Sequence, residues 1–169
     1  MTPPPGKLKI TPVPSVDTVV ETQLPPQAVR AALVDFSERR PEIWPGLTGD
    51  LYEVYSVGET TAEVKEGTKM PFGQVWAREH YDWSEPETVR WNVVESNFCT
   101  PGSYVSARLR PSEQGGTRVE IHWQRTGSSL IGRVVCGVIA ATNGKPVASS
   151  LKKALRKLEA TNSTPSPAP

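Results

Sequence analysis

Apolar and polar residues alternate along most of the chain between residues 50 and 125, a pattern typical of strands that bury one face. Glycine, proline, asparagine, aspartate or serine separates neighbouring segments, and "PSEQGGTR" is the clearest turn. Short connections of this kind favour antiparallel hairpins, so we expect a meander. The segments expected as strands are 50–57, 60–66, 73–83, 88–96, 103–111 and 117–125.

Segments on either side of this meander predict one more strand and several helices. Residues 15–24 are rich in β-branched side chains and predict a first strand. Residues 25–36 start with proline and repeat apolar residues at helical spacing, and residues 37–44 predict a second short helix capped by Ser37. Residues 128–142 are apolar almost all round, which predicts a buried helix, and the stretch 143–146 must interrupt it.

The last segment, residues 147–160, is amphipathic, with Leu151, Leu155 and Leu158 on one stripe and basic residues beside it. An antiparallel sheet has one apolar face that must be covered, and the final helix is the largest available cover. The predicted fold class is therefore α+β, a curved antiparallel sheet of about seven strands around a long C-terminal helix, with two short helices after the first strand.

Composition limits the function more than it suggests one. The chain has 169 residues, of which 37% are hydrophobic, and a formal net charge of +1, which argues against nucleic acid as a partner. Residues 130–141 form the longest apolar run, too short to span a bilayer and interrupted by Arg133, so we expect no stable membrane insertion. No secretory signal is apparent and only two cysteines occur, which favours a cytoplasmic location.

Both ends of the chain are rich in proline. We therefore expect a flexible N-terminus over residues 1–14, a single domain over residues 15–160 and a disordered tail over residues 161–169.

Strand parity predicts which side chains face the covering helix. In residues 117–123 the apolar positions share one face, and the same rule applied to the other strands selects a mainly aromatic inner set. Glu79 and Glu95 share the inward parity, and a buried carboxylate needs a partner or water. Arg125 continues the inward parity of its strand and is a candidate partner. The candidate ligand-binding residues are Tyr81, Trp83, Trp91, Val93, Glu95, Ala107, Ile121, Trp123 and Arg125.

Candidate catalytic groups are few. Glu95 and Glu79 are the candidate acid or base residues, because desolvation raises the pKa of a carboxyl group toward neutral pH. Parity places His80 and His122 on the outer face. The distant pairs of histidine and cysteine give no metal-site spacing, Cys99 and Cys136 are expected as buried small residues, and no cofactor motif occurs.

Three segments of the sequence resemble segments found in one protein superfamily. These are "FSERRPEIWPGL", "GGTRVEIHW" and "SLKKALRKLE", and they resemble segments of START-like, Bet v 1-like proteins, the polyketide cyclase/dehydrase and lipid-transport group. The resemblance covers residues 15–160 and implies a helix-grip fold with a ligand cavity between the sheet and the C-terminal helix. In this superfamily a loop such as the one carrying Trp44 can border the cavity entrance; the alternative is that Trp44 caps the core.

The sequence therefore supports three functions. The leading hypothesis is binding of an apolar or aromatic small molecule between the sheet and the helix. The first alternative is a cofactor-free enzyme similar to polyketide cyclases or dehydratases, and the second is an interaction protein whose core is filled. The identity of the ligand, catalytic turnover and the oligomeric state stay open.

Overall fold

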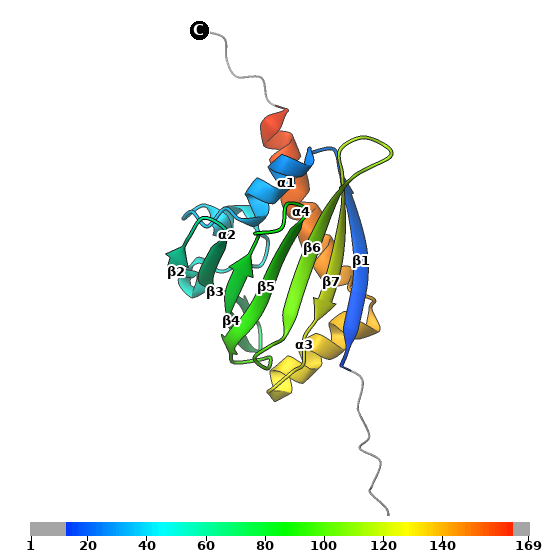
Figure 1. Ribbon diagram of the computed structural model, residues 1–169. Helices are drawn as coiled ribbons and strands as arrows, with labels where there is room; N and C mark the ends of the chain where they lie inside the picture. The colour runs from blue at the N-terminus through cyan, green and yellow to red at the C-terminus, as the bar shows by residue number, and fades with distance from the viewer. Residues whose placement is uncertain (1–12, 164–169) are drawn as a thin grey trace, which may run out of the picture.

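The computed structural model describes residues 13–163 of the chain, which form one seven-stranded antiparallel sheet with helices on one face (Figure 1). This arrangement confirms the predicted helix-grip fold class. The strands follow the order β1-β7-β6-β5-β4-β3-β2 across the sheet, so β1 and β2 form its two edges. Their bounds are β1 Ser15–Thr22, β2 Glu53–Val57, β3 Thr61–Met70, β4 Gly73–Asp82, β5 Thr88–Ser96, β6 Tyr104–Pro111 and β7 Thr117–Gln124.

The helices lie in two places along the chain. Two short helices follow β1 as predicted, α1 over Pro26–Leu33 and α2 over Arg40–Ile43, and a 3-10 turn, η1 over Gly49–Leu51, precedes β2. The predicted cap at Ser37 is wrong, because α2 begins later and Arg39 is its N-cap residue, without a side-chain capping bond. After β7 come α3 over Leu130–Ala141 and α4 over Lys145–Asn162. In Figure 1, α4 runs behind the strands, and α3 lies at the end of the sheet opposite to α1.

The inner face of the sheet follows the predicted alternation on its central strands. On β7, Val119, Ile121 and Trp123 are all buried, and Val105 and Ala107 of β6 are buried opposite Trp123 and Ile121. Each large aliphatic side chain buried in this way contributes about 1.5–3 kcal/mol through removal of apolar surface from water. The apolar face of the sheet is therefore the main core of the domain.

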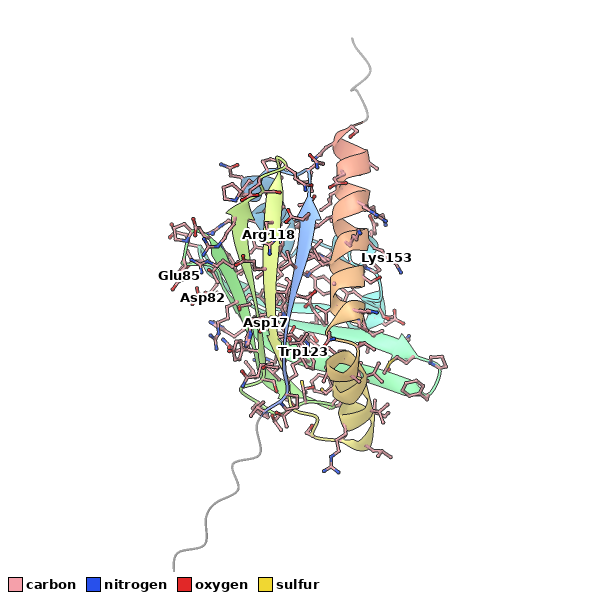
Figure 2. The ribbon with its side chains drawn as sticks, turned by 90° about the vertical axis from the view of Figure 1, so that its right-hand side faces the viewer. Asp17, Asp82, Glu85, Arg118, Trp123 and Lys153 are labelled. Atoms are coloured by element: carbon pink, nitrogen blue, oxygen red, sulfur yellow. The ribbon has the colours of Figure 1, made fainter. Side chains whose placement is uncertain are left out.

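Helix α4 covers this face with the predicted stripe. Leu151, Ala154 and Leu155 are buried, and the lysines beside them are exposed, as Figure 2 shows for Lys153 on the side of the helix away from the strands. Near its C-terminal end the helix is joined to β1, where the Thr22 hydroxyl donates a hydrogen bond to the carboxylate of Glu159. These contacts hold α4 at a defined distance from the sheet.

The predicted interruption of the C-terminal helix is present at Asn143 and Gly144, which have left-handed φ angles of 52° and 73°. Glycine is required at the second position, because a Cβ atom on Gly144 would lie 2.6 Å from Cγ1 of Val16. The chain changes direction at this point, so α3 does not continue along the sheet.

The prediction that α3 is buried all round is wrong. Only Gly132 and Cys136 of this helix are buried, whereas Leu130, Val134 and Val138 are 78%, 53% and 51% exposed. The physical reason is the left-handed break, which leaves α3 in contact with the end of the sheet through one face only. No helix within residues 13–163 is long and apolar enough to cross a membrane.

The predicted terminal segments lie mostly outside the described residues, namely most of the N-terminal segment 1–14 and residues 164–169. Helix α4 continues to Asn162, past the predicted domain end at residue 160, so the first residues of the predicted tail are helical.

Two glycines of α3 provide a test of how this helix is attached. A Cβ atom on Gly132 would lie 1.7 Å from the backbone oxygen of Phe98, whereas one on Gly137 would meet nothing within 4 Å. Gly132→Ala is therefore expected to lower the free energy of unfolding by about 1–3 kcal/mol through overpacking. Gly137→Ala, the matched control, should raise it by up to about 1 kcal/mol, because alanine favours the helix. Urea unfolding measures both, and equal effects would contradict the close packing of α3 on Phe98.

Candidate functional site

A cavity of about 360 Å³ lies between the inner face of the sheet and α4. Its walls come from the end of α1, the α2 region, strands β3 to β7 and the first turns of α4. Most of the wall is apolar, and four charged side chains enter it. The apolar and aromatic lining residues are Leu33, Trp44, Pro45, Leu47, Val75, Ala77, Tyr81, Trp91, Phe98, Val105, Ile121, Trp123, Val147 and Leu151.

The structure brings several of the sequence-predicted residues together in this wall. Tyr81, Trp91, Ile121, Trp123 and Arg125 all line the cavity. The rings of Tyr81 and Trp91 are paired across β4 and β5 and stack with their centroids 5.4 Å apart. The expected aromatic wall is therefore present.

Three other predicted residues are buried but lie outside the cavity wall. Trp83 packs against Phe36, with ring centroids 5.9 Å apart, at the α1 end of β4. Val93 belongs to a small separate cluster with Ala77 and Cys99. Ala107 is fully buried between neighbouring strands. The sequence predicts these three as ligand-binding residues; they are buried, as inward parity requires, but they pack within the core and do not line the cavity.

The inward orientation predicted for Glu95 is wrong. Its carboxylate is on the exposed face of the sheet and does not line the cavity. The cause is a β-bulge: Arg78 pairs with Glu95, but the next residue, Glu79, pairs with Val93, which leaves Val94 as an extra residue in β5. One extra residue reverses the alternation beyond it. Glu95 therefore joins Arg78 on the outer face.

Glu79 does enter the cavity, where it is 3% exposed and forms an ion pair with Arg125. Nη2 of Arg125 donates a hydrogen bond to Oε1 of Glu79, and Nη1 lies 3.9 Å from Sγ of Cys99. The partnership predicted between an inward carboxylate and Arg125 is thus present, with Glu79 as the carboxylate. Arg125 is held one residue beyond the end of β7, in line with Trp123.

The sequence analysis missed a second buried ion pair, between Arg40 and Glu66. Arg40 is the first residue of α2 and is 4% exposed, and its Nη1 donates to the backbone oxygens of Leu33 and Asp35 at 3.1 and 3.0 Å. Its Nη2 donates to the Tyr81 hydroxyl at 3.2 Å, and that hydroxyl donates to Oε2 of Glu66 at 2.7 Å. Arg40 therefore has most of its donors satisfied.

Strand parity could have identified Glu66 as an inward residue. Glu66 continues the alternation of Ala62 and Val64, both buried, and its strand position is paired with Ala77 of β4. Arg40 carried no such signal, because a short polar helix after α1 gives no indication of which side chain turns inward.

The two carboxyl groups of the cavity differ in their pKa. Burial raises the pKa of Glu79 to about 7, with the nearby charge of Glu66 adding to the effect and Arg125 opposing it. Burial alone would also raise the pKa of Glu66, but the charge of Arg40 and hydrogen bonds from Arg40 and Tyr81 outweigh it and lower that pKa. Glu66 is therefore a permanent carboxylate, whereas Glu79 gains and loses a proton near neutral pH.

Other candidate groups lie away from the cavity. His122 is on the outer face, where Nδ1 lies 2.8 Å from Oδ1 of Asp17, and His80 does not line the cavity. Cys99 and Cys136 are free and buried, as expected, and burial raises the pKa of the Cys136 thiol to about 11. Among residues 13–163, no group of three or more histidine, cysteine or acidic side chains is placed to hold a metal ion.

The sequence of the chain matches no protein-family model and no curated protein. Solved structures are similar in fold. A protein from Thermus thermophilus has a TM-score of 0.72 at 18% identity, with 89% of this chain and all of that chain covered. The Zhui aromatase/cyclase from a Streptomyces species has a TM-score of 0.69 at 14% identity, covering 86% of this chain and 93% of that one.

A START superfamily protein from Mycobacterium smegmatis has a TM-score of 0.68 at 11% identity, covering 85% of this chain and 98% of that one. Similarity at such identities establishes the arrangement of strands and helices and leaves the activity to be argued from the site. The chain therefore has the helix-grip fold of START-like, Bet v 1-like proteins, as its sequence predicts.

Proposed function

We propose that the protein binds an apolar or aromatic small molecule in the cavity between the sheet and α4. The observation that carries this proposal is the cavity itself, about 360 Å³ in volume and walled mainly by apolar and aromatic side chains. That volume and that lining are typical of small-molecule sites, in which a few polar groups orient a mostly apolar ligand. The driving force would be burial of ligand surface, at about 25 cal/mol per Å².

The wall supplies suitable contacts for a flat ring. Tyr81 and Trp91 present stacked rings from neighbouring strands, and Trp123 lines the same cavity from β7. Aromatic rings bury large areas and gain further from offset or edge contacts with another ring. Arg125 and Glu79 would orient the polar end of the ligand.

The cavity argues against the alternative of a filled core with a purely surface function. The fold neighbours include proteins described as an aromatase/cyclase and as a START superfamily member, which supports a cavity-based function in this fold. A lipid as the apolar ligand belongs to the same proposal. The cytoplasmic location and the lack of a nucleic-acid partner stay predictions of the sequence.

A second candidate function is acid–base catalysis similar to that of a cyclase or dehydratase. The observation that favours it is Glu79, a cavity carboxyl whose pKa is raised to about 7 beside the guanidinium of Arg125. A base with a pKa near neutral removes a proton effectively, and a cation beside it stabilises the negative charge of an enolate.

Exchange of carbon-bound hydrogen measures this activity directly. In deuterated buffer, Glu79 would remove a proton from the carbon next to the carbonyl of 2-tetralone, and deuterium would return from solvent. If the protein is such a catalyst, we expect NMR to show faster exchange than in buffer, and Glu79→Gln should abolish the difference. The same rate with and without protein would exclude Glu79 as a base and leave the binding function alone.

Trp91→Ala provides a test of the aromatic wall. Loss of the stacked ring is expected to weaken binding of N-phenyl-1-naphthylamine, a neutral apolar fluorophore, about tenfold, or about 1.4 kcal/mol. The free energy of unfolding should change less than the binding free energy, because Trp91 is only half-buried. Trp76→Ala, on the outer face of β4 against Lys65, is the matched control and should leave affinity unchanged. Unaltered binding by folded Trp91→Ala protein would count against a wall role.

A second pair of variants tests the position of the cavity. Val147 lines it from the first turns of α4, and Ser149, two residues further along that helix, is exposed. Val147→Trp should fill the space and reduce fluorophore binding at least tenfold, whereas Ser149→Trp should have little effect. Fluorescence titration measures both, and equal affinities would show that the probe binds elsewhere.

A further inference from the structure

Two buried N–H groups in the cavity wall have no hydrogen-bond partner among the described residues. They are Nε of Arg125 and Nε1 of Trp44. Arg125 is 9% exposed, so water does not replace the missing acceptor freely. A buried donor without an acceptor is unfavourable, and both orphan groups are donors. They therefore favour a ligand that carries acceptor oxygens.

The charges of the wall favour a ligand with one negative charge. Two cations, Arg40 and Arg125, accompany two carboxyl groups, Glu66 and Glu79, which lie on neighbouring strands within hydrogen-bonding reach of each other. Like charges this close and this buried disfavour ionisation of both groups, so the pair tends to keep one proton. With that proton in place, the wall has two positive charges and one negative charge.

The neighbouring groups favour placing this proton on Glu79 and not on Glu66. Glu66 of β3 is fixed as a carboxylate by Arg40 of α2 and by the Tyr81 hydroxyl. Arg125 faces Glu79 from the end of β7 and also contacts the Cys99 thiol, and the Cys136 thiol of α3 lies near enough to interact with Cys99 and Arg125. The α4 residues that line the cavity are Val147, Ser150 and Leu151, which do not titrate.

On the basis of the proposed binding function, we propose that the ligand is an apolar or aromatic monoanion, a carboxylate or enolate, whose oxygen accepts from Arg125 while Glu79 takes up one proton from solvent. The ligand anion then replaces the Glu79 charge as the counterion of Arg125, and the wall together with the ligand is neutral. A dianion such as a phosphate ester would leave an unpaired charge in an apolar cavity, which is strongly unfavourable.

The sign of the pH dependence follows from this exchange. Below pH 7 Glu79 is already protonated and the cavity is ready for an anion; above pH 7 binding must first protonate it. Affinity for an anionic ligand should therefore fall as pH rises through about 7, approaching tenfold for each further pH unit. Affinity for a neutral ligand of the same shape should not follow this curve.

Isothermal titration calorimetry with 2-naphthoate and 2-naphthamide tests the proposal, because the two differ in charge and share one ring system. Between about pH 6 and pH 8.5, wild-type affinity for naphthoate should fall about ten- to thirtyfold, the loss expected for one linked proton. Titration at the higher pH in buffers of different ionisation enthalpy should show uptake of about one proton. At the lower pH naphthamide should bind more weakly than naphthoate, and its binding should take up no proton.

Variants of Glu79 and Arg125 separate the role of the proton from the role of the positive charge. Glu79→Gln keeps a neutral side chain of the same shape, and it should bind naphthoate equally at both pH values with no proton uptake. Arg125→Met should lose the preference for naphthoate over naphthamide. Arg125→Lys keeps the charge and serves as a second variant if the methionine variant does not fold; it should retain part of the preference.

The neutral fluorophore distinguishes failure of this inference from failure of the binding function. Equal, pH-independent binding of naphthoate and naphthamide, together with fluorophore binding, would overturn the inference and leave the cavity as an apolar site. Naphthoate preference that persists unchanged in Glu79→Gln, pH dependence included, would also overturn it. Absence of binding by all three probes would overturn both.

Discussion

The cavity depends on one constraint, which is that charged groups buried inside an apolar domain must be paired. Glu66 and Glu79 point from neighbouring strands into the space below α4, and each has its own arginine, Arg40 or Arg125. Removing one member of such a pair would leave a buried charge without compensation, which costs several kcal/mol. The two pairs therefore join α2 to β3 and the residue after β7 to β4.

The paired charges lie where a cavity separates the sheet from the helix. Leu151 and Leu155 of α4 are buried on the apolar part of the sheet, whereas at the level of Tyr81 the wall carries polar groups that hydrogen-bond one another. The break at Asn143 and Gly144 gives α3 a different direction from α4, and Phe98 lines the cavity at this end. A space with an apolar wall and a polar end is the result.

This arrangement connects fold and function through two protonation states. Glu66 is a fixed carboxylate and Glu79 exchanges a proton near neutral pH, although both are acidic residues on adjacent strands. The difference comes from the number of donors around each: Arg40 and Tyr81 serve Glu66, whereas Glu79 has Arg125 and a neighbouring negative charge. Environment, and not residue type, separates the permanent charge from the variable one.

The sequence by itself determined the fold and much of the cavity wall, because alternation with a period of two is a local property of a strand. It identified Tyr81, Trp91, Ile121, Trp123 and Arg125 as inward residues, together with Glu79, and it located the interruption before α4. Only the tertiary structure decided that Glu95 lies outside, because the bulge at Val94 exists only when β4 and β5 are paired. The inward turn of Arg40 and the exposure of one face of α3 were likewise decided by packing between segments far apart in the chain, a relation that no local pattern of side chains contains.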